Sequence, residues 1–168
     1  MSKTVLSKLW GLYQRYFWEL SEPCLEALRL RLKPGMRTLE TGSGRSTFVF
    51  EEAGCEHIAL EHNAWLAPKL PSVVIAPLKG DPPWYDWRPS HSFDLILIDG
   101  PAHGRSPVLK VLPQCMKSST IVFIDDTDRR ADRAIAEQIA REYGLTATTR
   151  SHWALIPRTF TILEPRQP

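Results

Sequence analysis

Two short segments in the second half of the chain carry apolar side chains at almost every position. These segments are Phe93–Asp99 (FDLILID) and Thr120–Asp125 (TIVFID). A strand of this composition needs apolar cover on both faces, as in a parallel sheet that lies between two layers of helices. The pattern therefore predicts two central, buried strands, each of which ends in a carboxylate.

Weaker strand patterns alternate with segments whose apolar residues recur at helical spacing. Besides the two central strands, we predict strands at Met36–Thr41, His57–Glu61, Ser72–Ala76, Leu145–Thr149 and Arg158–Leu163, and helices at Ser46–Ala53, Ala64–Leu70, Arg105–Lys117 and Asp128–Tyr143. Prolines mark the stretch from Pro68 to Pro89 as rich in loops. Strands that alternate with helices indicate an α/β fold with right-handed crossovers. Because no linker divides the chain, we expect residues 1–168 to form a single domain.

The first 34 residues carry a helical pattern. Apolar side chains, among them Trp10 and Phe17, recur at helical spacing over about residues 4–20, which predicts an amphipathic helix. Charged residues such as Lys8 and Arg15 interrupt the segment, so it lacks the apolar core of a signal peptide. We expect residues 1–34 to pack on the body of the domain, and we keep a homodimer contact and a substrate lid as alternative uses of the helix.

The composition is that of a globular protein and excludes several classes. Hydrophobic residues make up 43% of the 168 residues and charged residues 24%, which are ordinary values for a folded domain. The apolar runs fall short of the roughly 20 residues that cross a membrane, and a net charge of +2 does not support a broad nucleic-acid-binding face. Three widely spaced cysteines, Cys24, Cys55 and Cys115, indicate a reducing, cytoplasmic setting rather than disulfides or a zinc site.

A glycine-containing turn follows the first predicted strand of the sheet and opens a helix. In the segment Glu40–Thr47 (ETGSGRST), Gly42 and Gly44 allow a tight turn and a close approach of the backbone to a ligand. The following helix offers free N–H groups at its N-terminus. Glu61 ends the next predicted strand, where an acid can accept hydrogen bonds from both hydroxyls of a ribose. Together these features indicate a cofactor that contains adenosine.

Two adenosine cofactors remain open, and charge separates them. A dinucleotide site favours a third glycine where this chain has Thr47, and an acid at Glu40 would repel a pyrophosphate. The same acid favours S-adenosylmethionine, whose amino group and sulfonium are positive. The turn therefore favours S-adenosylmethionine, with an NAD-linked oxidoreductase and a plain strand–turn–helix corner as alternatives.

The combination LETGSGRST, IALEH, FDLILIDGPAH and IVFIDD resembles the class I S-adenosylmethionine-dependent methyltransferases over about residues 36–126. The resemblance implies a Rossmann-like, mostly parallel seven-stranded sheet with one antiparallel strand and helices on both faces. By position it implies that Glu61 binds the ribose, that His62 lies against the adenine and that Asp81 meets the adenine amine. The full set of implied cofactor contacts is Glu40, Thr41, Gly42, Ser43, Gly44, Ser46, Glu61, His62, Asp81 and Asp99.

Three carboxylates end the two central strands. Asp99 closes the first strand, and Asp125 and Asp126 close the second, so adjacent parallel strands would bring them to one rim of the sheet. Carboxylates so close together either raise one another's pKa or share a cation, and oxygen ligands suit Mg²⁺, Mn²⁺ or Ca²⁺. The pattern is similar to the metal-dependent small-molecule and sugar O-methyltransferases, which implies a divalent metal here. An N-cap role for Asp126 is the alternative.

The loop after Asp99 supplies a candidate base. His103 has an ordinary pKa of about 6.5, which suits removal of a proton from a hydroxyl at neutral pH. The sugar-modifying relatives carry an acid where this chain has Pro101, so we assign catalysis to His103 together with Asp99. Arg105 either binds an acidic group of the acceptor or stays solvated in the next helix. We therefore expect O-methylation of a small-molecule or sugar-like acceptor, with a catalytically silent partner module as the alternative.

Overall fold

The computed structural model describes residues 19–102, 104–153 and 157–166. Its helices are α2 (Glu22–Arg29), α3 (Arg45–Glu52), α4 (Val108–Cys115) and α5 (Arg130–Tyr143). Its strands are β1 (Arg37–Thr41), β2 (Glu56–Glu61), β3 (Val73–Ile75), β4 (Leu78–Lys79), β5 (Trp84–Tyr85), β6 (Leu95–Ile98), β7 (Ile121–Ile124), β8 (Thr146–Trp153) and β9 (Pro157–Glu164).

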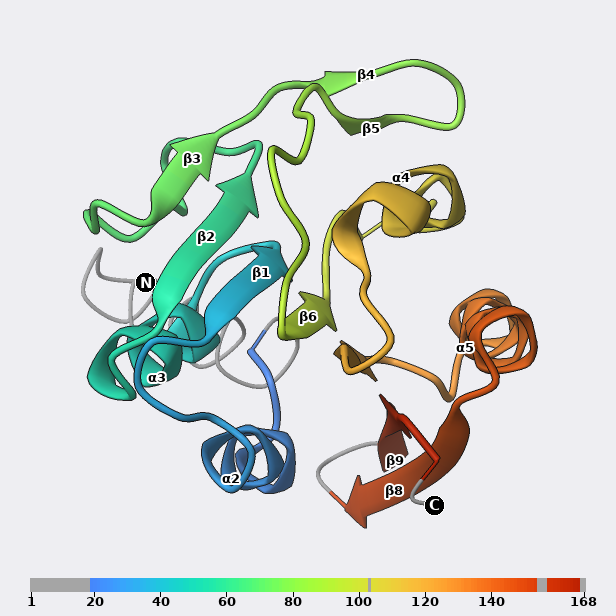
Figure 1. Cartoon of the computed structure of the whole chain (residues 1–168). Helices are drawn as coiled ribbons and strands as arrows, with labels where there is room; N and C mark the ends of the chain where they lie inside the picture. The colour runs from blue at the N-terminus through green and yellow to red at the C-terminus, as the bar shows by residue number, and fades with distance from the viewer. Residues whose placement is uncertain (1–18, 103, 154–156, 167–168) are drawn as a thin grey trace, which may run out of the picture.

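Seven of these strands form one sheet in the order β3-β2-β1-β6-β7-β9-β8 (Figure 1). All neighbours pair in parallel except at β9, which runs antiparallel to both β7 and β8. The chain builds outward from β1 to β3 and then returns to the other side of β1 with β6. The predicted mostly parallel sheet with one antiparallel strand is confirmed, and its strand order reverses between β1 and β6.

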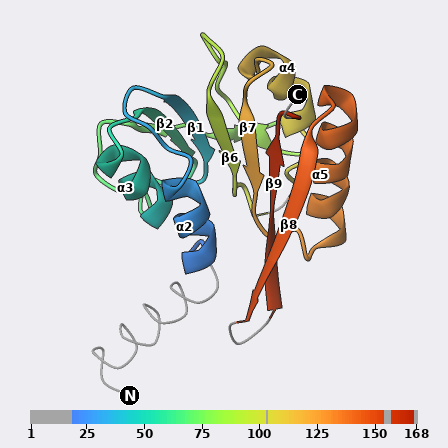
Figure 2. The same cartoon turned by 60° about the horizontal axis from the view of Figure 1, so that its bottom comes forward.

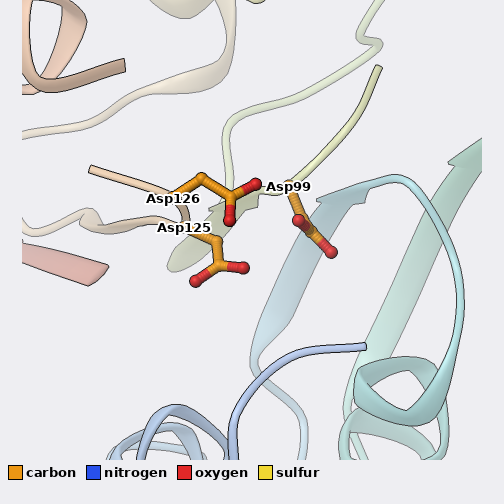
Figure 3. Close-up of side chains that lie close together, drawn as sticks. All are labelled: Asp99, Asp125 and Asp126. Atoms are coloured by element: carbon orange, nitrogen blue, oxygen red, sulfur yellow. The ribbon is translucent and has the colours of Figure 1, made fainter. Parts of the chain in front are cut away.

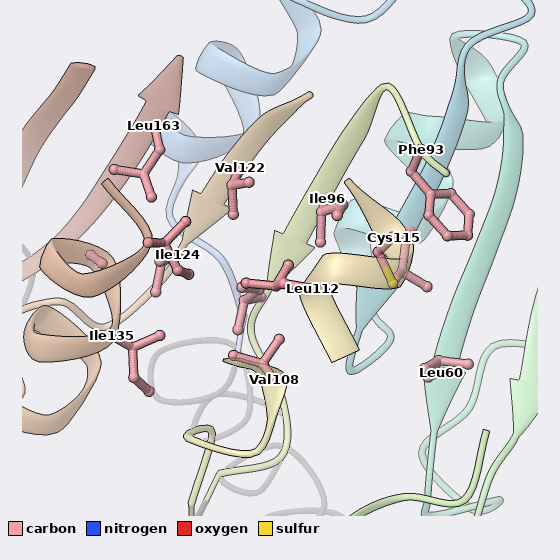
Figure 4. Packing of buried hydrophobic residues seen from close by; sticks show 14 of the residues in the cluster. Leu60, Phe93, Ile96, Val108, Leu112, Cys115, Val122, Ile124, Ile135 and Leu163 are labelled. Atoms are coloured by element: carbon pink, nitrogen blue, oxygen red, sulfur yellow. The ribbon is translucent and has the colours of Figure 1, made fainter. Parts of the chain in front are cut away.

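Helices cover both faces of this sheet, as predicted. Figure 2 shows α2 and α3 on one face and α4 and α5 on the other. Every residue of β6 is buried, because β6 lies at the centre of the sheet and between both helical layers. On α4, Val108, Leu112 and Cys115 recur at helical spacing and pack toward the central strands (Figure 4).

The helix α2 anchors the described end of the N-terminal segment. Ser21 caps it by accepting a hydrogen bond from the N–H of Cys24 at 3.3 Å. Its buried residues Leu25 and Leu28 pack in one apolar cluster with Phe50 of α3. The amphipathic helix predicted for about residues 4–20, and with it the homodimer contact, lies almost wholly outside the described residues. No described helix is both long enough and apolar enough to span a membrane.

The predicted helix Ala64–Leu70 is wrong, because this segment forms turns. Asn63 holds the turn: its carbonyl accepts from Leu66 and its side-chain oxygen accepts from the N–H of Trp65 at 3.1 Å. Pro68 lacks the N–H that a continuing helix would need, so the helical pattern cannot extend beyond one turn.

Two further differences concern α4 and the loop-rich stretch. The helix α4 begins at Val108 and not at Arg105, because Ser106 and Pro107 form a turn ahead of it and Pro107 is its N-cap residue. The stretch from Pro68 to Pro89 contains a short antiparallel hairpin, β4–β5, which lies apart from the main sheet (Figure 1). The sequence pattern did not predict this hairpin, because closely spaced prolines argue against strands.

Candidate active site

A cavity of about 770 Å³ lies over the sheet beside the point where the strand order reverses, the usual ligand position in open α/β sheets. Most of the predicted cofactor residues line it, namely Gly42, Ser43, Gly44, Ser46, Glu61, His62 and Asp99. Glu40, Thr41 and Asp81 are not part of the lining. Seven of the ten predicted cofactor residues thus line one cavity, and their role in binding a cofactor stays a prediction.

Two loops meet at the cavity in backbone contact. Gly42 follows β1 with a φ of 88°, a conformation that favours glycine. A Cβ added to Gly100, after β6, would lie 2.9 Å from the nitrogen of Gly42. Thr41 reinforces the junction, since its carbonyl accepts a hydrogen bond from the Gly100 N–H at 2.6 Å. Glycine is therefore required at both positions: Gly42 has a positive φ, and Gly100 has no room for a Cβ.

Glu40 supports the glycine turn from within the core. It is almost fully buried, and its carboxylate accepts hydrogen bonds from the hydroxyls of Ser46 and Thr47 and lies 3.3 Å from Nε2 of His57. Thr47 in turn accepts from the Gly44 N–H at 3.0 Å. The structure thus uses Glu40 to hold the turn against α3 and does not bring its charge to the cavity wall.

Glu61 ends β2 at the cavity. Its side chain is buried, but its carboxylate still has free positions for accepting hydrogen bonds. Its two oxygens accept hydrogen bonds from the Ser43 hydroxyl at 3.1 Å and from the Asn63 N–H at 2.8 Å. His62 lies beside it, with Nδ1 3.2 Å from a Glu61 oxygen. A carboxylate offers about four acceptor positions, so Glu61 can also accept from a vicinal diol.

Asp81 lies apart from this group. It is exposed in the turn between β4 and β5 and does not line the cavity. Tyr85, from β5 of the same hairpin, does line it. The cluster of aromatic residues Trp84, Tyr85 and Trp87 is the sequence signal that could have indicated this wall, although aromatic density alone does not distinguish a cavity wall from a plug of the core.

The three carboxylates at the ends of β6 and β7 do come together. Asp99, Asp125 and Asp126 each offer an oxygen within 4.8 Å of the others (Figure 3). The predicted clustering is therefore confirmed. The alternative role of Asp126 as a helix cap is wrong, because α5 starts after Arg129, whose side chain makes no capping bond.

Two buried guanidiniums occupy the space between these acids. Arg105 Nη2 lies 3.0 Å from an oxygen of Asp126 and 3.4 Å from one of Asp99. Arg158 Nη2, from β9, lies 2.9 Å from Asp125 and 2.7 Å from Asp126. Both arginines also donate to backbone carbonyls, Arg105 to Asp125 at 2.7 Å and Arg158 to Glu19 at 3.1 Å, so their positions are fixed from several directions.

This arrangement does not fit a divalent metal ion. A metal needs carboxylate lone pairs directed at one empty point, whereas both oxygens of Asp126 and one oxygen of Asp125 are directed at Arg158 and Arg105. Among the described residues only the second oxygen of Asp125, Oδ1, is buried without a partner in this cluster of acids. An added dication would have to share these three carboxylates with two buried guanidiniums that already pair with them, and the guanidiniums would repel it. The acid cluster by itself had indicated a metal ion as its source of positive charge. In the structure, the two arginines supply that charge.

Burial and mutual repulsion perturb the acids themselves. Burial, and then the charge of Asp125, raise the pKa of Asp99 well above its ordinary value. Burial and the charge of Asp126 raise the pKa of Asp125 to about 6. Burial opposes ionisation of Asp126 too, but the guanidiniums of Arg105 and Arg158 outweigh it and lower its pKa. Asp99 and Asp126 both line the cavity, and of these two only Asp99 has a raised pKa, which makes it the better candidate to exchange a proton with a ligand.

His103, the predicted base, lies outside the described residues, although its neighbours Pro101 and Ala102 line the cavity. Arg105 is not solvated, since its side chain is 3% exposed. Both of its Nη atoms pair with the acid cluster or its backbone, whereas its Nε has no partner among the described residues. Arg158 was not among the predicted site residues. Its partners Asp125 and Asp126 lie more than 30 residues earlier in the chain, so no local pattern indicates their pairing.

No protein-family model and no curated protein sequence matches this chain. Among solved structures, an O-methyltransferase from Bacillus cereus in complex with SAH aligns with a TM-score of 0.65 at 16% identity, covering 99% of this chain and 92% of that one. A putative O-methyltransferase from Klebsiella pneumoniae gives a TM-score of 0.67 at 19% identity, with the same coverages. A precorrin-6y C5,15-methyltransferase from Geobacter metallireducens gives 0.66 at 10% identity over 88% of this chain and 92% of that one. The chain therefore has the fold that its motifs led us to expect, that of the class I S-adenosylmethionine-dependent methyltransferases.

Proposed function

We propose that this protein is an S-adenosylmethionine-dependent methyltransferase that methylates an oxygen of a small-molecule or sugar-like acceptor. The observation that carries the proposal is the buried Glu61 carboxylate beside the glycine turn, on a cavity at the strand-order reversal. The bound SAH of the Bacillus cereus neighbour supports the choice of cofactor. The volume of about 770 Å³ lies within the roughly 300–1,000 Å³ range of small-molecule sites.

Each wall of the cavity then has a task. S-adenosylmethionine supplies a methyl group on a positively charged sulfur. Glu61 accepts hydrogen bonds from the ribose hydroxyls, and Ser43 and Asn63 hold its carboxylate in place. The rigid junction of Gly42 and Gly100 lets the backbone approach the ligand closely. Fixing both reactants in this way supplies much of the rate acceleration in a displacement.

Proton removal from the acceptor falls to the chain's own side chains. Asp99 lines the cavity, and burial raises the pKa of its carboxyl group, which makes its carboxylate a stronger proton acceptor than an ordinary aspartate. His103 follows in the same loop and stays the predicted base on its sequence position, with Asp99 as the alternative base. Because the acid cluster does not fit a metal, we propose that this step needs no divalent ion.

Titration calorimetry with SAH and with NADH tests the assignment. Wild-type protein should bind SAH and not NADH. Glu61→Ala should weaken SAH binding by about 1.5–3 kcal/mol, the usual worth of hydrogen bonds to a charged group. The matched control is Glu56→Ala, which removes the exposed carboxylate at the other end of β2 and should leave the affinity unchanged. Equal affinity of wild type and Glu61→Ala would remove the ribose assignment.

A further inference from the structure

Four of the described arginines line the cavity, and three of them already have several partners. Arg105 and Arg158 are buried, and their terminal nitrogens pair with the acid cluster and with backbone carbonyls. Arg45, at the start of α3, has two glutamate oxygens at 2.8 and 3.6 Å from its terminal nitrogens. Arg129, the residue before α5, is the fourth, and the proposed reaction assigns it no role.

Arg129 is more exposed and less engaged than the other three arginines. Its side chain is 47% exposed, and its one ion pair in the described part of the chain joins Nη1 to an oxygen of Asp126 at 3.0 Å. Arg105 and Arg158 already donate hydrogen bonds to that carboxylate, at 3.0 and 2.7 Å, so Asp126 does not need a third cation. A guanidinium carries five N–H donors, and most of those on Arg129 are available to a molecule in the cavity.

The position of Arg129 indicates which molecule this is. Its partner Asp126 belongs to the same cluster as Asp99, with oxygens of the two acids within 4.8 Å of each other. Glu61, the proposed ribose carboxylate, ends β2, whereas Asp126 and Arg129 follow β7, and both β1 and β6 lie between these two strands. A group held by Arg129 therefore lies near the proposed proton acceptor and away from the ribose, on the acceptor's side of the cavity.

We propose that Arg129 binds a carboxylate of the acceptor, so that the substrate is a hydroxy acid, an inference that rests on the proposed function. The planar fork of a guanidinium matches a carboxylate through two parallel N–H···O bonds. From the sequence alone, Arg105 was the candidate for this task. Arg105 cannot perform it, because its terminal nitrogens are paired and its one unpaired nitrogen, Nε, is itself buried.

Two pairs of probes that keep the shape and differ in charge test the proposal: salicylate with salicylamide, and lactate with lactamide. In titration calorimetry of the SAH-loaded protein, at least one acid should bind about tenfold more tightly than its amide, the usual worth of a hydrogen bond to a charged group. Arg129→Gln should abolish this preference and leave the Kd for SAH unchanged. Arg129→Lys keeps the charge without the fork and should retain part of the preference. Arg130→Gln removes an exposed arginine at the next position, outside the cavity lining, and should retain all of it.

Three outcomes would overturn the inference. One is wild-type protein that binds acid and amide equally or binds neither, and another is a preference that survives in Arg129→Gln. The third is loss of SAH binding in Arg129→Gln, which would show that Arg129 shapes the cavity as a whole. If the wild-type protein does not bind SAH, the proposed function itself is wrong, and titration of the ligand-free protein with the same probes still tests the carboxylate site.

Discussion

Removing Arg158 tests whether the acid cluster is held together by arginines. Its guanidinium, 9% exposed, contacts Asp125 and Asp126 at 2.9 and 2.7 Å. Replacement by methionine keeps much of the side-chain volume but leaves a buried negative charge without its cation. Breaking a buried pair in this way costs roughly 3–5 kcal/mol, a large part of the ~5–15 kcal/mol by which a domain is stable.

The stability lost on replacing Arg158 should depend on pH, and the pKa of Asp125 determines whether the loss grows or shrinks as the pH rises. Its pKa in the folded protein, about 6, lies above the ordinary value of 3.8. The folded state therefore binds more protons than the unfolded state between these values, and stability contributed by this group is lost as the pH rises through about 6. Loss of Arg158 raises that pKa further, so a proton can replace the missing cation at pH 5 but not at pH 8.

Urea unfolding of wild type and Arg158→Met, followed by circular dichroism, measures the loss of stability and its dependence on pH. We expect a loss of about 3–5 kcal/mol at pH 8 and a clearly smaller loss at pH 5. Arg150→Met removes an exposed arginine from the adjacent strand β8 and should cost little at either pH. A loss below about 1 kcal/mol at pH 8, typical of surface pairs, would refute the reasoning, as would equal losses at the two values.

Three further predictions concern the cavity. Gly100→Ala places a Cβ 2.5 Å from the Tyr85 hydroxyl, so urea unfolding should show a loss of about 1–3 kcal/mol in stability and calorimetry should show weaker SAH binding. The control Gly44→Ala, whose Cβ meets no atom within 4 Å, should keep the stability. A fully stable Gly100→Ala variant would contradict the backbone contact. Excess EDTA should leave turnover and melting temperature unchanged, and a rise of either with Mg²⁺ would reinstate a metal. His103→Ala should lower kcat by about 10²–10⁴ without changing cofactor affinity, whereas normal turnover would leave Asp99 as the base.

Local patterns in the sequence were enough for the central strands and the glycine turn. The unbroken apolar runs that became β6 and β7 can be stable only with cover on both faces, and Gly42 permits a turn that a side chain would strain. The meeting of Asp99 with Asp125 also followed, because the carboxyl ends of adjacent parallel strands share one edge. These features depend on residues that are near in sequence or on a rule of strand pairing.

Tertiary structure decided which charges neutralise the acids and which groups reach the cavity. Arg158 meets Asp125 only because β9 inserts beside β7, and no local pattern states that pairing. Tyr85 reaches the cavity through a hairpin that prolines obscured, and Glu40 turned into the core because Ser46, Thr47 and His57 satisfy its carboxylate there. A side chain's local sequence fixes its chemistry and its backbone preference, whereas its partners depend on the order of the strands in space.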